Sequence, residues 1–445
     1  MIRLRFAPSP TGFLHVGNVR SAILNWIYAK KNNGEFILRI DDTDSLRSKK
    51  DYENAIKDNL KWLGLDWHKT FNQSSRNELY EKNISKLKEI NKLYPCFETQ
   101  EELALKKKAL LSSGKPPIYD RSSLSLTNKE IEQFLNEGKR PHWRFKLEPE
   151  LISWNDSIKG KVSFDSKLLS DPILIREDGS LLYHLPSVID DINEEITHII
   201  RGEDHISNTA FHIQIFKSLN SSVPNFAHHP FLTDEDGKSF GKRLGSLSIE
   251  NIKEQGFENI ALLNYLLNIG SSNDIVAEKN IQSLIDNFNL NTISASNPKF
   301  SIEILKSLNK SLLQSYNTDD ISDRINLINK KLSNDKLWQF VKNNINFFSE
   351  IKQWIEIIES EKITIPTNID NDFLEKSINH LPDEPFNENT WEIWTKKIKE
   401  ETGYSGKDLF MSLRFILTGM HKGPELKYLL PLLNKNIILK KFGKL

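Results

Sequence analysis

Apolar and polar residues alternate at the start of the chain, where Ile2, Leu4 and Phe6 are separated by arginines. A period of two is typical of a strand with one buried face. Pro8 and Pro10 follow directly, and proline cannot donate a hydrogen bond to a neighbouring strand. The pattern therefore predicts a short first strand that ends in a loop near residue 7.

The apolar pattern then changes to helical spacing. Residues 19, 22, 23, 26 and 27 are apolar and share one side of a helix that follows Gly17, and Asn32-Asn33-Gly34 ends it. Residues 36–40 form a second apolar run. Two strands joined by a helix imply a parallel pair with a right-handed crossover, and the loops at the carboxyl ends of such strands form a ligand crevice. Residues 7–17 and 41–44 are thus predicted to lie on one rim.

The predicted rim carries side chains suited to a nucleotide and an amino acid. Residues 15–18 (HVGN) lie at a helix N-terminus, where free N–H groups and the helix dipole favour phosphate. Gly17 lets a base or phosphate approach the backbone, and His15 can donate to a phosphate oxygen. Arg5 can hold a carboxylate in a fork, while Asp41 and Asp44 can accept from an ammonium group. These residues alone leave open a second interpretation, a rim histidine with solvated acids.

The string RFAPSPTGFLHVGN, followed by LRIDDTD, closely resembles the start of the bacterial glutamyl-tRNA synthetases, class I enzymes with the HIGH signature. The resemblance implies an α/β fold with a Rossmann-like parallel-sheet catalytic domain, an inserted α+β acceptor-binding domain and an all-α C-terminal region. It places the catalytic domain at residues 1–93 and 190–235 and the inserted tRNA acceptor-binding domain at 94–189. A KMSKS-loop and helical stem-contact domain then covers residues 236–315, and a helical anticodon-binding domain covers 316–445.

A later stretch, LLYHLPSVIDDINEEITHIIRGEDHISNT, resembles the second catalytic half of the family. We expect a strand over residues 192–200, which would place Arg201 at a carboxyl end facing the same crevice. The family usually has Glu where Asp41 stands and Asn where Ser187 stands, so both side chains are shorter here. By residue-to-residue match, the resemblance implies that the glutamate pocket is lined by Arg5, Ala7, Ser9, Asp41, Tyr183 and Arg201.

The loop FLTDEDGKSFGKRLGSLSI resembles the second class I signature, KMSKS, which here reads Ser239-Phe240-Gly241-Lys242-Arg243. Ser239 replaces the usual first lysine and Gly241 the usual serine. Lys238, one position earlier, is a candidate substitute for the missing lysine. The resemblance implies that His15 and Lys242 are catalytic, and that ATP is bound by His15, Gly17, Asn18, Lys242 and Arg243.

Two further segments bear on partners and metals. Residues 316–445 show helical patterns and resemble the family's anticodon-binding domain, and the resemblance makes Arg414 the predicted tRNA contact. The alternative is a helical bundle that only buries its own apolar face. The stretch YPCFETQEELALKKKALLSSGKPPIYDRSS resembles the family's zinc-bearing segment. A structural zinc site takes four ligands, usually Cys or His, but Cys96 has no cysteine partner and matching positions hold Glu98 and Ser122. We therefore expect no structural zinc and no dedicated metal site, with Mg²⁺ arriving on ATP as substrate.

Composition constrains the number of domains, the possible partners and the compartment of the protein. The chain has 445 residues with 60 basic and 60 acidic side chains, so several domains are expected. Zero net charge leaves an RNA partner open, because phosphate contacts need local patches only. The single cysteine excludes a disulfide framework within the chain, and no apolar run reaches the roughly 20 residues of a membrane span. With no signal peptide in the first residues, we expect a soluble cytoplasmic monomer.

The function implied by the resemblance is that of a glutamate–tRNA ligase. Such an enzyme activates L-glutamate with ATP to glutamyl-AMP and transfers it to the 3′ end of tRNA-Glu, with tRNA-Gln left open as a second substrate. One alternative is a glutaminyl-tRNA synthetase, but the resembling enzymes end in β-barrels rather than helices. Another is a catalytically weakened tRNA-binding paralogue, supported only by the altered lysine loop. A truncated paralogue that glutamylates a modified tRNA base is a third alternative, but such a protein lacks the anticodon-binding domain and this chain is too long for it.

Overall fold

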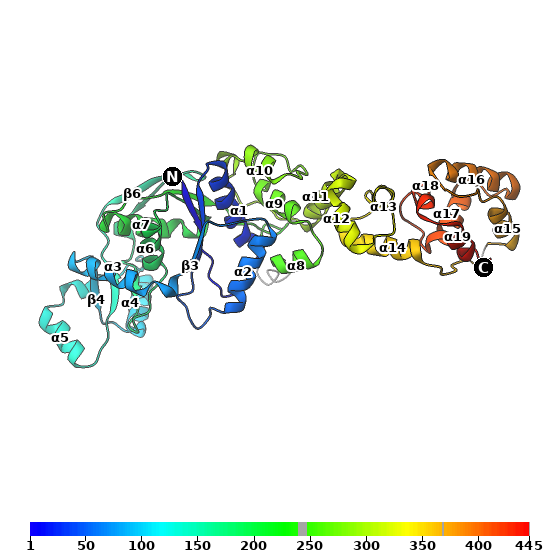
Figure 1. The fold of residues 1–445 in the computed structure, drawn as a ribbon. Helices are drawn as coiled ribbons and strands as arrows, with labels where there is room; N and C mark the ends of the chain where they lie inside the picture. Colours follow the sequence, from blue (N-terminus) through cyan, green and yellow to red (C-terminus); the bar gives the residue numbers. More distant parts are fainter. Residues whose placement is uncertain (239–246, 367–368, 445) are drawn as a thin grey trace. The chain divides into compact units, whose positions relative to one another are not determined.

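The computed structural model describes residues 1–238, 247–366 and 369–444 (Figure 1). The chain divides into two compact units. Unit 1 comprises Met1–Ile252, Leu263–Ile275 and Asn280–Ser301, and unit 2 comprises Lys253–Leu262, Val276–Lys279 and Ile302–Leu445. The finer division into four domains remains a prediction.

A three-stranded parallel sheet begins unit 1. Strands β1 (Arg3–Phe6), β2 (Glu35–Ile40) and β3 (Lys69–Asn72) lie in the order β1-β2-β3, and both pairings are parallel. Helix α1 (Val16–Lys31) forms the crossover between β1 and β2 and buries its apolar side chains. This strand–helix–strand arrangement confirms the prediction for the first forty residues.

The second parallel pair consists of β9 (His198–Gly202) and β10 (Asn225–His229). The backbone N–H of Thr197 donates to the carbonyl of Arg3 at 3.0 Å, so β9 begins beside β1. The expected strand over residues 192–200 is only partly correct. Helix α6 (His184–Asn193) extends into it, and a left-handed residue, Glu195, separates that helix from β9. Helix α7 (Ile206–Ser218) then connects β9 to β10.

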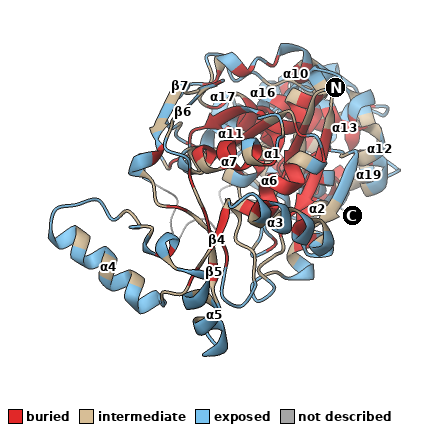
Figure 2. Cartoon of the chain, turned by 90° about the vertical axis from the view of Figure 1, so that its left-hand side faces the viewer, coloured by how far each residue is buried: buried red, intermediate tan, exposed pale blue. Residues whose placement is uncertain are grey.

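The segment predicted as an insertion contains antiparallel strands. β4 (Leu93–Cys96), β5 (His142–Phe145) and β8 (Ile173–Ile175) form one sheet. Helices α4 (Gln100–Ser112) and α5 (Asn128–Asn136) contain no buried residue and are pale blue in Figure 2. The hairpin β6 (Leu151–Asp156) and β7 (Gly160–Asp165) leaves that sheet and contacts β10, where Ser157 N–H donates to the carbonyl of Phe226 at 2.9 Å.

Further helices belong to unit 1 or to the stretch of sequence in which the two units alternate. Their bounds are α2 (Lys50–Trp62), α3 (Asn77–Glu89), α8 (Ile249–Glu254), α9 (Asn259–Asn268) and α10 (Ile281–Asn287). Short 3-10 helices lie at η1 (Gln73–Ser75), η2 (Ser122–Ser125), η3 (Ser166–Leu168), η4 (Glu203–His205) and η6 (Leu290–Thr292).

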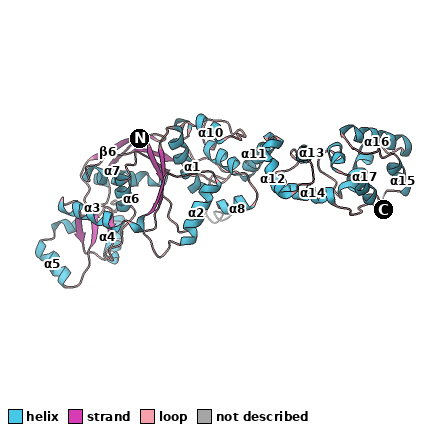
Figure 3. Cartoon of the chain, viewed as in Figure 1, coloured by secondary structure: helices cyan, strands magenta, loops and turns pink. Residues whose placement is uncertain are grey.

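Unit 2 is helical throughout its described part, and every strand assigned belongs to unit 1 (Figure 3). One hydrophobic cluster, centred on Trp338, Phe373 and Trp394, holds its helices together. Among the described residues, no helix is both long and apolar enough to cross a membrane. The helices are α11 (Ile302–Ser315), α12 (Thr318–Ile328), α13 (Asn334–Val341), α14 (Ile351–Glu359), α15 (Asn371–Asn379), α16 (Glu388–Thr402), α17 (Gly406–Thr418), α18 (Leu426–Leu429) and α19 (Lys435–Lys441), with η7 (Phe348–Glu350) and η8 (Leu430–Leu432) between them.

Candidate active site

A pocket of about 580 Å³ lies in unit 1, where β1, β2 and β9 end and α1 begins. Its lining includes every residue predicted from the sequence for the glutamate and ATP sites that the structure describes. Ser21, Asp204, His205, His229 and Phe231 line it as well, and the sequence analysis did not identify them. The predicted residues that meet here are Arg5, Ala7, Ser9, His15, Gly17, Asn18, Asp41, Tyr183 and Arg201.

His15 caps helix α1 with its side chain. Its Nδ1 accepts from the backbone N–H of Gly17 at 3.1 Å, and the Asn18 carboxamide oxygen accepts from the His15 N–H at 3.4 Å. Burial lowers the pKa of His15, so the ring is neutral at pH 7. Because Nδ1 is an acceptor, Nε2 carries the proton and can donate. A Cβ on Gly17 would lie 3.0 Å from His15 Cε1, so this capping arrangement favours glycine.

Arg201, in β9, is buried among neutral groups. Its guanidinium donates to Tyr183 Oη at 3.2 Å, Thr209 Oγ1 at 2.5 Å, His228 Nε2 at 3.2 Å and the His205 carbonyl at 3.4 Å. Within the described part of the chain, no carboxylate lies in ion-pair range of this guanidinium. Burial lowers the pKa of Arg201 from its usual value. A buried cation without an anion is costly, so a bound carboxylate would stabilise this site strongly.

Arg5 and Asp41 are engaged by other buried charges. Arg5 Nε and Nη2 donate to the two Asp191 oxygens at 3.0 and 3.3 Å. Arg39 Nε and Nη2 donate to the two Asp41 oxygens at 2.7 and 3.1 Å, and Arg39 Nη1 reaches Asp191 at 2.9 Å. Burial raises the pKa of Asp41 despite this pairing. The ammonium-binding role predicted for Asp41 must therefore use lone pairs that Arg39 leaves available.

Arg39 was not among the residues predicted from the sequence. In addition to Asp41 and Asp191, its guanidinium donates to the Ser187 carbonyl at 3.2 Å and to Ser187 Oγ at 3.3 Å. Asp41 and Ser187, where the family usually has longer side chains, thus contact the same guanidinium. A signal was present in the sequence, because Arg39 interrupts an apolar strand and Asp190-Asp191 interrupt the apolar side of α6. Buried charges in such positions are usually paired.

Four further residues predicted from the sequence are not among the described residues that line this pocket. Lys242 and Arg243 fall outside the described residues. Lys238, their proposed companion, is exposed in a turn in which its backbone N–H donates to Asp234 Oδ1 at 2.8 Å. Arg414, in α17 of unit 2, is half-buried and donates through Nη1 to the Pro424 carbonyl at 2.8 Å. Burial lowers the pKa of Arg414.

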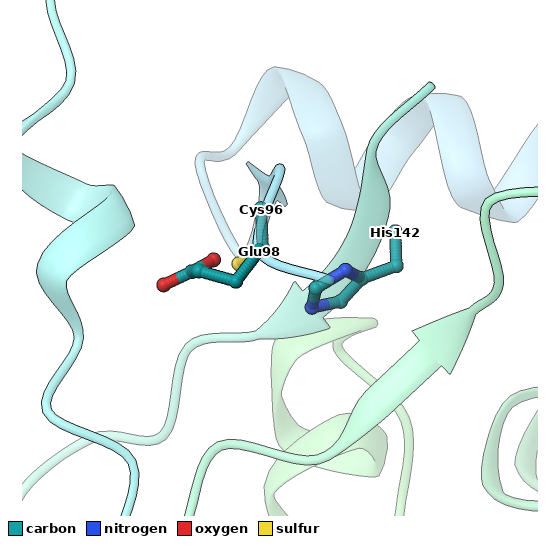
Figure 4. A group of neighbouring side chains, drawn as sticks. All are labelled: Cys96, Glu98 and His142. Carbon is teal, nitrogen blue, oxygen red and sulfur yellow. The ribbon is translucent and has the colours of Figure 1, made fainter. Parts of the chain in front are cut away.

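The region around the single cysteine brings together three groups that can bind a metal. Ligand atoms of Cys96, Glu98 and His142 lie within 4.8 Å of one another, and Figure 4 draws the sulfur between the carboxylate and the imidazole. His142 was not identified from the sequence, and its Nε2 is buried without a hydrogen-bond partner. Hydroxyl groups of Tyr119 and Ser123 donate to Glu98, each at 2.8 Å.

Protonation opposes metal binding by this set. Burial raises the pKa of Cys96 to about 11 in the metal-free protein, so a metal would have to displace the thiol proton on binding. Partial burial of Glu98 opposes its ionisation, but hydrogen bonds from Tyr119 and Ser123 outweigh this and hold its pKa at about 2. The set is also one ligand short of the four that structural zinc takes. The donors therefore fit a hydrogen-bonded cluster better than a zinc site.

Comparison with known families divides the chain into two parts. Residues 1–307 match the family model described as tRNA synthetases class I (E and Q), catalytic domain. Residues 303–444 match the family model of an anticodon binding domain. The first match alone covers well over half of the chain.

Individual relatives match over nearly the whole length. The chain is 45% identical to glutamate–tRNA ligase 1 of Rickettsia massiliae (strain Mtu5), over 98% of both sequences. It is also 45% identical to glutamate–tRNA ligase 2 of Rickettsia canadensis (strain McKiel), again over 98% of both. The crystal structure of a glutamate tRNA ligase from Elizabethkingia meningosepticum CCUG26117, in complex with its amino acid, matches with a TM-score of 0.87 at 26% identity, covering 100% of this chain and 98% of that one. By these matches, the chain belongs to the family of class I tRNA synthetases (E and Q) that includes the glutamate–tRNA ligases.

Proposed function

We propose that the chain is a glutamate–tRNA ligase, which activates L-glutamate with ATP and transfers the glutamyl group to the 3′ end of tRNA. The observation that carries this proposal is the Arg201 guanidinium, buried in the pocket with neutral partners only among the described residues. A carboxylate supplies the missing negative charge, and a carboxamide does not. Glutamate offers two carboxylates to Arg201 and Arg5, whereas glutamine offers only its α-carboxylate, and this difference favours glutamate as the amino acid.

The glutamate site follows from the charges around it. Arg201 and Arg5 pair with the carboxylates of glutamate, and Asp41 accepts from its ammonium group. Tyr183 lies beside the bound carboxylate, because its hydroxyl oxygen accepts a hydrogen bond from Arg201 Nη1. Ala7 and Ser9 lie on the loop that follows β1 and line the same pocket.

ATP binds at the N-terminus of α1. Gly17 and Asn18 contribute the start of the helix, where free N–H groups favour phosphate. His15 donates from Nε2 to a phosphate oxygen, since its Nδ1 is occupied by the Gly17 N–H. Lys242 and Arg243 stabilise the charge on the departing pyrophosphate. Mg²⁺ enters with ATP and is held mainly by phosphate and water oxygens.

The reaction proceeds in two group transfers. An α-carboxylate oxygen of glutamate attacks the α-phosphorus of ATP, the new P–O bond forms, and the bond to pyrophosphate breaks. A hydroxyl of the terminal adenosine of tRNA then attacks the glutamyl carbonyl, and AMP leaves. Positioning and charge stabilisation supply most of the acceleration, so little acid–base chemistry is needed.

The proposed RNA partner is tRNA-Glu. Unit 2 supplies the anticodon contact, with Arg414 as its candidate residue. The resemblance leaves tRNA-Gln open, so tRNA-Gln stands as a second candidate. We further propose a monomer that acts in the cytoplasm, and a segment around Cys96 that folds without zinc.

Aminoacylation of purified tRNA-Glu and tRNA-Gln, each with glutamate and with glutamine, tests the proposal. Glutamylation of tRNA-Glu is the expected result. Glutaminylation of tRNA-Gln would instead support a glutaminyl-tRNA synthetase. Binding of tRNA without charging, and without tRNA-dependent ATP–pyrophosphate exchange, would support a weakened tRNA-binding paralogue. The Rickettsia relatives described above are both named glutamate–tRNA ligases, which favours the first outcome.

A further inference from the structure

Behind Arg201 lies a buried carboxylate that has no place in the proposed pocket lining. Asp156 ends β6, in the hairpin of the predicted insertion, yet its side chain reaches His228 of β10. Its Oδ2 accepts a hydrogen bond from His228 Nδ1, and its Oδ1 accepts from the His228 backbone N–H at 3.0 Å. Asp156 is 4% exposed and His228 is 0% exposed, so water does not compete for these bonds.

The other side of the His228 ring faces Arg201. Nε2 lies 3.2 Å from Arg201 Nε and 2.9 Å from Thr209 Oγ1. The N–H of Arg201 can only donate, so Nε2 must be an acceptor and the neutral ring must carry its proton on Nδ1. Thr209 Oγ1 also accepts from Arg201 Nη2 at 2.5 Å. With its proton on Nδ1, His228 accepts from Arg201 Nε, while Thr209 Oγ1 accepts from Arg201 Nη2 on the same edge of the guanidinium.

We propose that Asp156 is a positioning residue for carboxylate recognition, acting through the tautomer of His228 to orient Arg201. An ionised carboxylate accepts only, so Asp156 holds the proton of His228 on Nδ1. Burial opposes ionisation of Asp156, but its hydrogen bonds from His228 and the backbone lower its pKa to about 2. The inference rests on the proposed function for the identity of the ligand, an amino-acid carboxylate. The orientation of Arg201 by the Asp156–His228 pair does not depend on that identity.

The substitution Asp156→Asn tests the tautomer directly. Oδ1 accepts from three backbone N–H groups, those of His228, Ile158 and Lys159, at 3.0 to 3.1 Å. These donors keep the oxygen of an asparagine in place, so its NH₂ group must face His228 Nδ1. The ring then carries its proton on Nε2, where it opposes the N–H of Arg201. The change preserves the shape of the side chain and its three backbone contacts. It removes the acceptor of the 3.4 Å contact from Trp154 Nε1 and reverses the hydrogen bond with His228.

The expected result is a selective effect on glutamate. In ATP–pyrophosphate exchange with tRNA present, Asp156→Asn should raise KM for glutamate by about tenfold to a hundredfold, as expected for a lost hydrogen bond to a charged group. KM for ATP should stay unchanged. Asp165→Asn is the matched control, because Asp165 is exposed on the partner strand β7 and caps only the N–H of Lys167. It should leave both constants unchanged.

Two further measurements separate positioning from a general structural role. Nitrogen-15 NMR of histidine-labelled protein should show His228 protonated on Nδ1 in the wild type and on Nε2 in Asp156→Asn. In His228→Gln, where the Gln oxygen replaces Nε2 as acceptor, adding Asp156→Asn should not raise KM for glutamate further. An unchanged tautomer, or additive effects of the two changes, would overturn the inference.

Arg201→Ala, assayed in parallel, distinguishes this inference from the proposed function. If Arg201→Ala raises KM for glutamate and Asp156→Asn does not, the inference fails and the pocket assignment stands. If neither variant affects glutamate while the tautomer switches as expected, Asp156 orients Arg201 but Arg201 does not bind the substrate. That outcome would refute the proposed glutamate pocket, but it would still support the orientation of Arg201 by the Asp156–His228 pair.

Discussion

Arg39 binds Asp41 through a fork, with Nε 2.7 Å from Oδ1 and Nη2 3.1 Å from Oδ2. The third nitrogen of the same guanidinium reaches Asp191, which in turn binds Arg5. One arginine therefore joins both acidic groups behind the proposed glutamate site. Arg39 is 1% exposed, so its charge must be compensated entirely within the protein.

Arg39→Met should destabilise unit 1 severely. The change leaves Asp41 and part of Asp191 as uncompensated buried charge, and breaking one partner of a buried ion pair costs about 3–5 kcal/mol. Urea unfolding monitored by tryptophan fluorescence measures the loss. Arg47→Met is the matched control, because Arg47 is exposed and pairs only with Asp44 three residues away; it should unfold like the wild type. Equal stability of the two variants would refute the importance of the buried pair.

Arg201→Ala should abolish glutamate use and spare ATP binding. Among the described residues no carboxylate forms an ion pair with this guanidinium, and Asp191 acts on it only through its field, so we expect a bound carboxylate to supply most of the missing negative charge. Loss of one partner of a buried charge pair with the substrate costs about 3–5 kcal/mol, which corresponds to at least a hundredfold in KM for glutamate. Tryptophan fluorescence titrated with ATP measures the second substrate. A near-normal KM for glutamate would exclude Arg201 from the pocket.

The sequence predicted well which strand ends and which helix start form this site, because these elements follow from hydrophobic patterns within short segments. Alternating residues before Pro8 and a glycine at the start of a helix place His15 and Asp41 at one rim whatever lies around them. The resemblance supplied Tyr183 and Arg201, which come from a distant part of the chain.

What the sequence did not predict depends on pairing across long separations. Asp156 and His228 lie 72 positions apart, and nothing local to either shows that they meet. The boundary of α6 was missed for a related reason. Asp190 and Asp191 look unlike helix-core residues, and distant partners explain why they are buried there. Arg5 and Arg39 bind Asp191, while Gln73, Tyr80 and Arg76 hold Asp190.

Metal analysis tests the prediction for the Cys96 cluster. Purified, chelator-washed protein should contain no stoichiometric zinc, because only three candidate ligands meet among the described residues and the hydroxyl groups of Tyr119 and Ser123 already donate to Glu98. Cys96→Ser should then leave metal content and thermal stability nearly unchanged. One equivalent of zinc that is lost in Cys96→Ser and in His142→Ala would show that the three groups bind the metal after all.

The stability of unit 1 should fall as the pH drops below about 6.5, because buried histidines resist protonation. Burial lowers the pKa of His184 from 6.5 to about 4. Between these values the unfolded chain binds a proton that the folded chain does not, so this contribution is complete above pH 6.5 and is lost as the pH falls towards 4. His184 alone accounts for about 2 kcal/mol between pH 7 and pH 5. Urea unfolding at several pH values should show a shallower dependence in His184→Gln, and an unchanged slope would mean that folding does not lower the pKa of His184.

The last prediction concerns the loop that carries Lys242, which lies outside the described residues. Two lysines normally share the charge of the departing pyrophosphate, but here Ser239 replaces the first and only Lys242 stands in a motif position. Gly241 likewise stands where the signature usually has a serine, so that hydroxyl is also missing. Lys242→Ala should therefore lower kcat for tRNA-dependent exchange on the order of a hundredfold or more, the usual cost of one lost charge-stabilising donor in a closed site.

Lys238→Ala decides whether the lysine just before the motif performs the second role. Its side chain is exposed in a turn anchored by Asp234, so removing it should not disturb the fold. If Lys238 contacts pyrophosphate in the closed state, the variant should lose about tenfold or more in kcat, since a charged donor is lost, and Ser239→Lys should partly restore it. Full activity of Lys238→Ala would leave Lys242 without a lysine partner in this loop. Full activity of Lys242→Ala would instead show that the alignment of the loop is wrong and that another cation stabilises the leaving group.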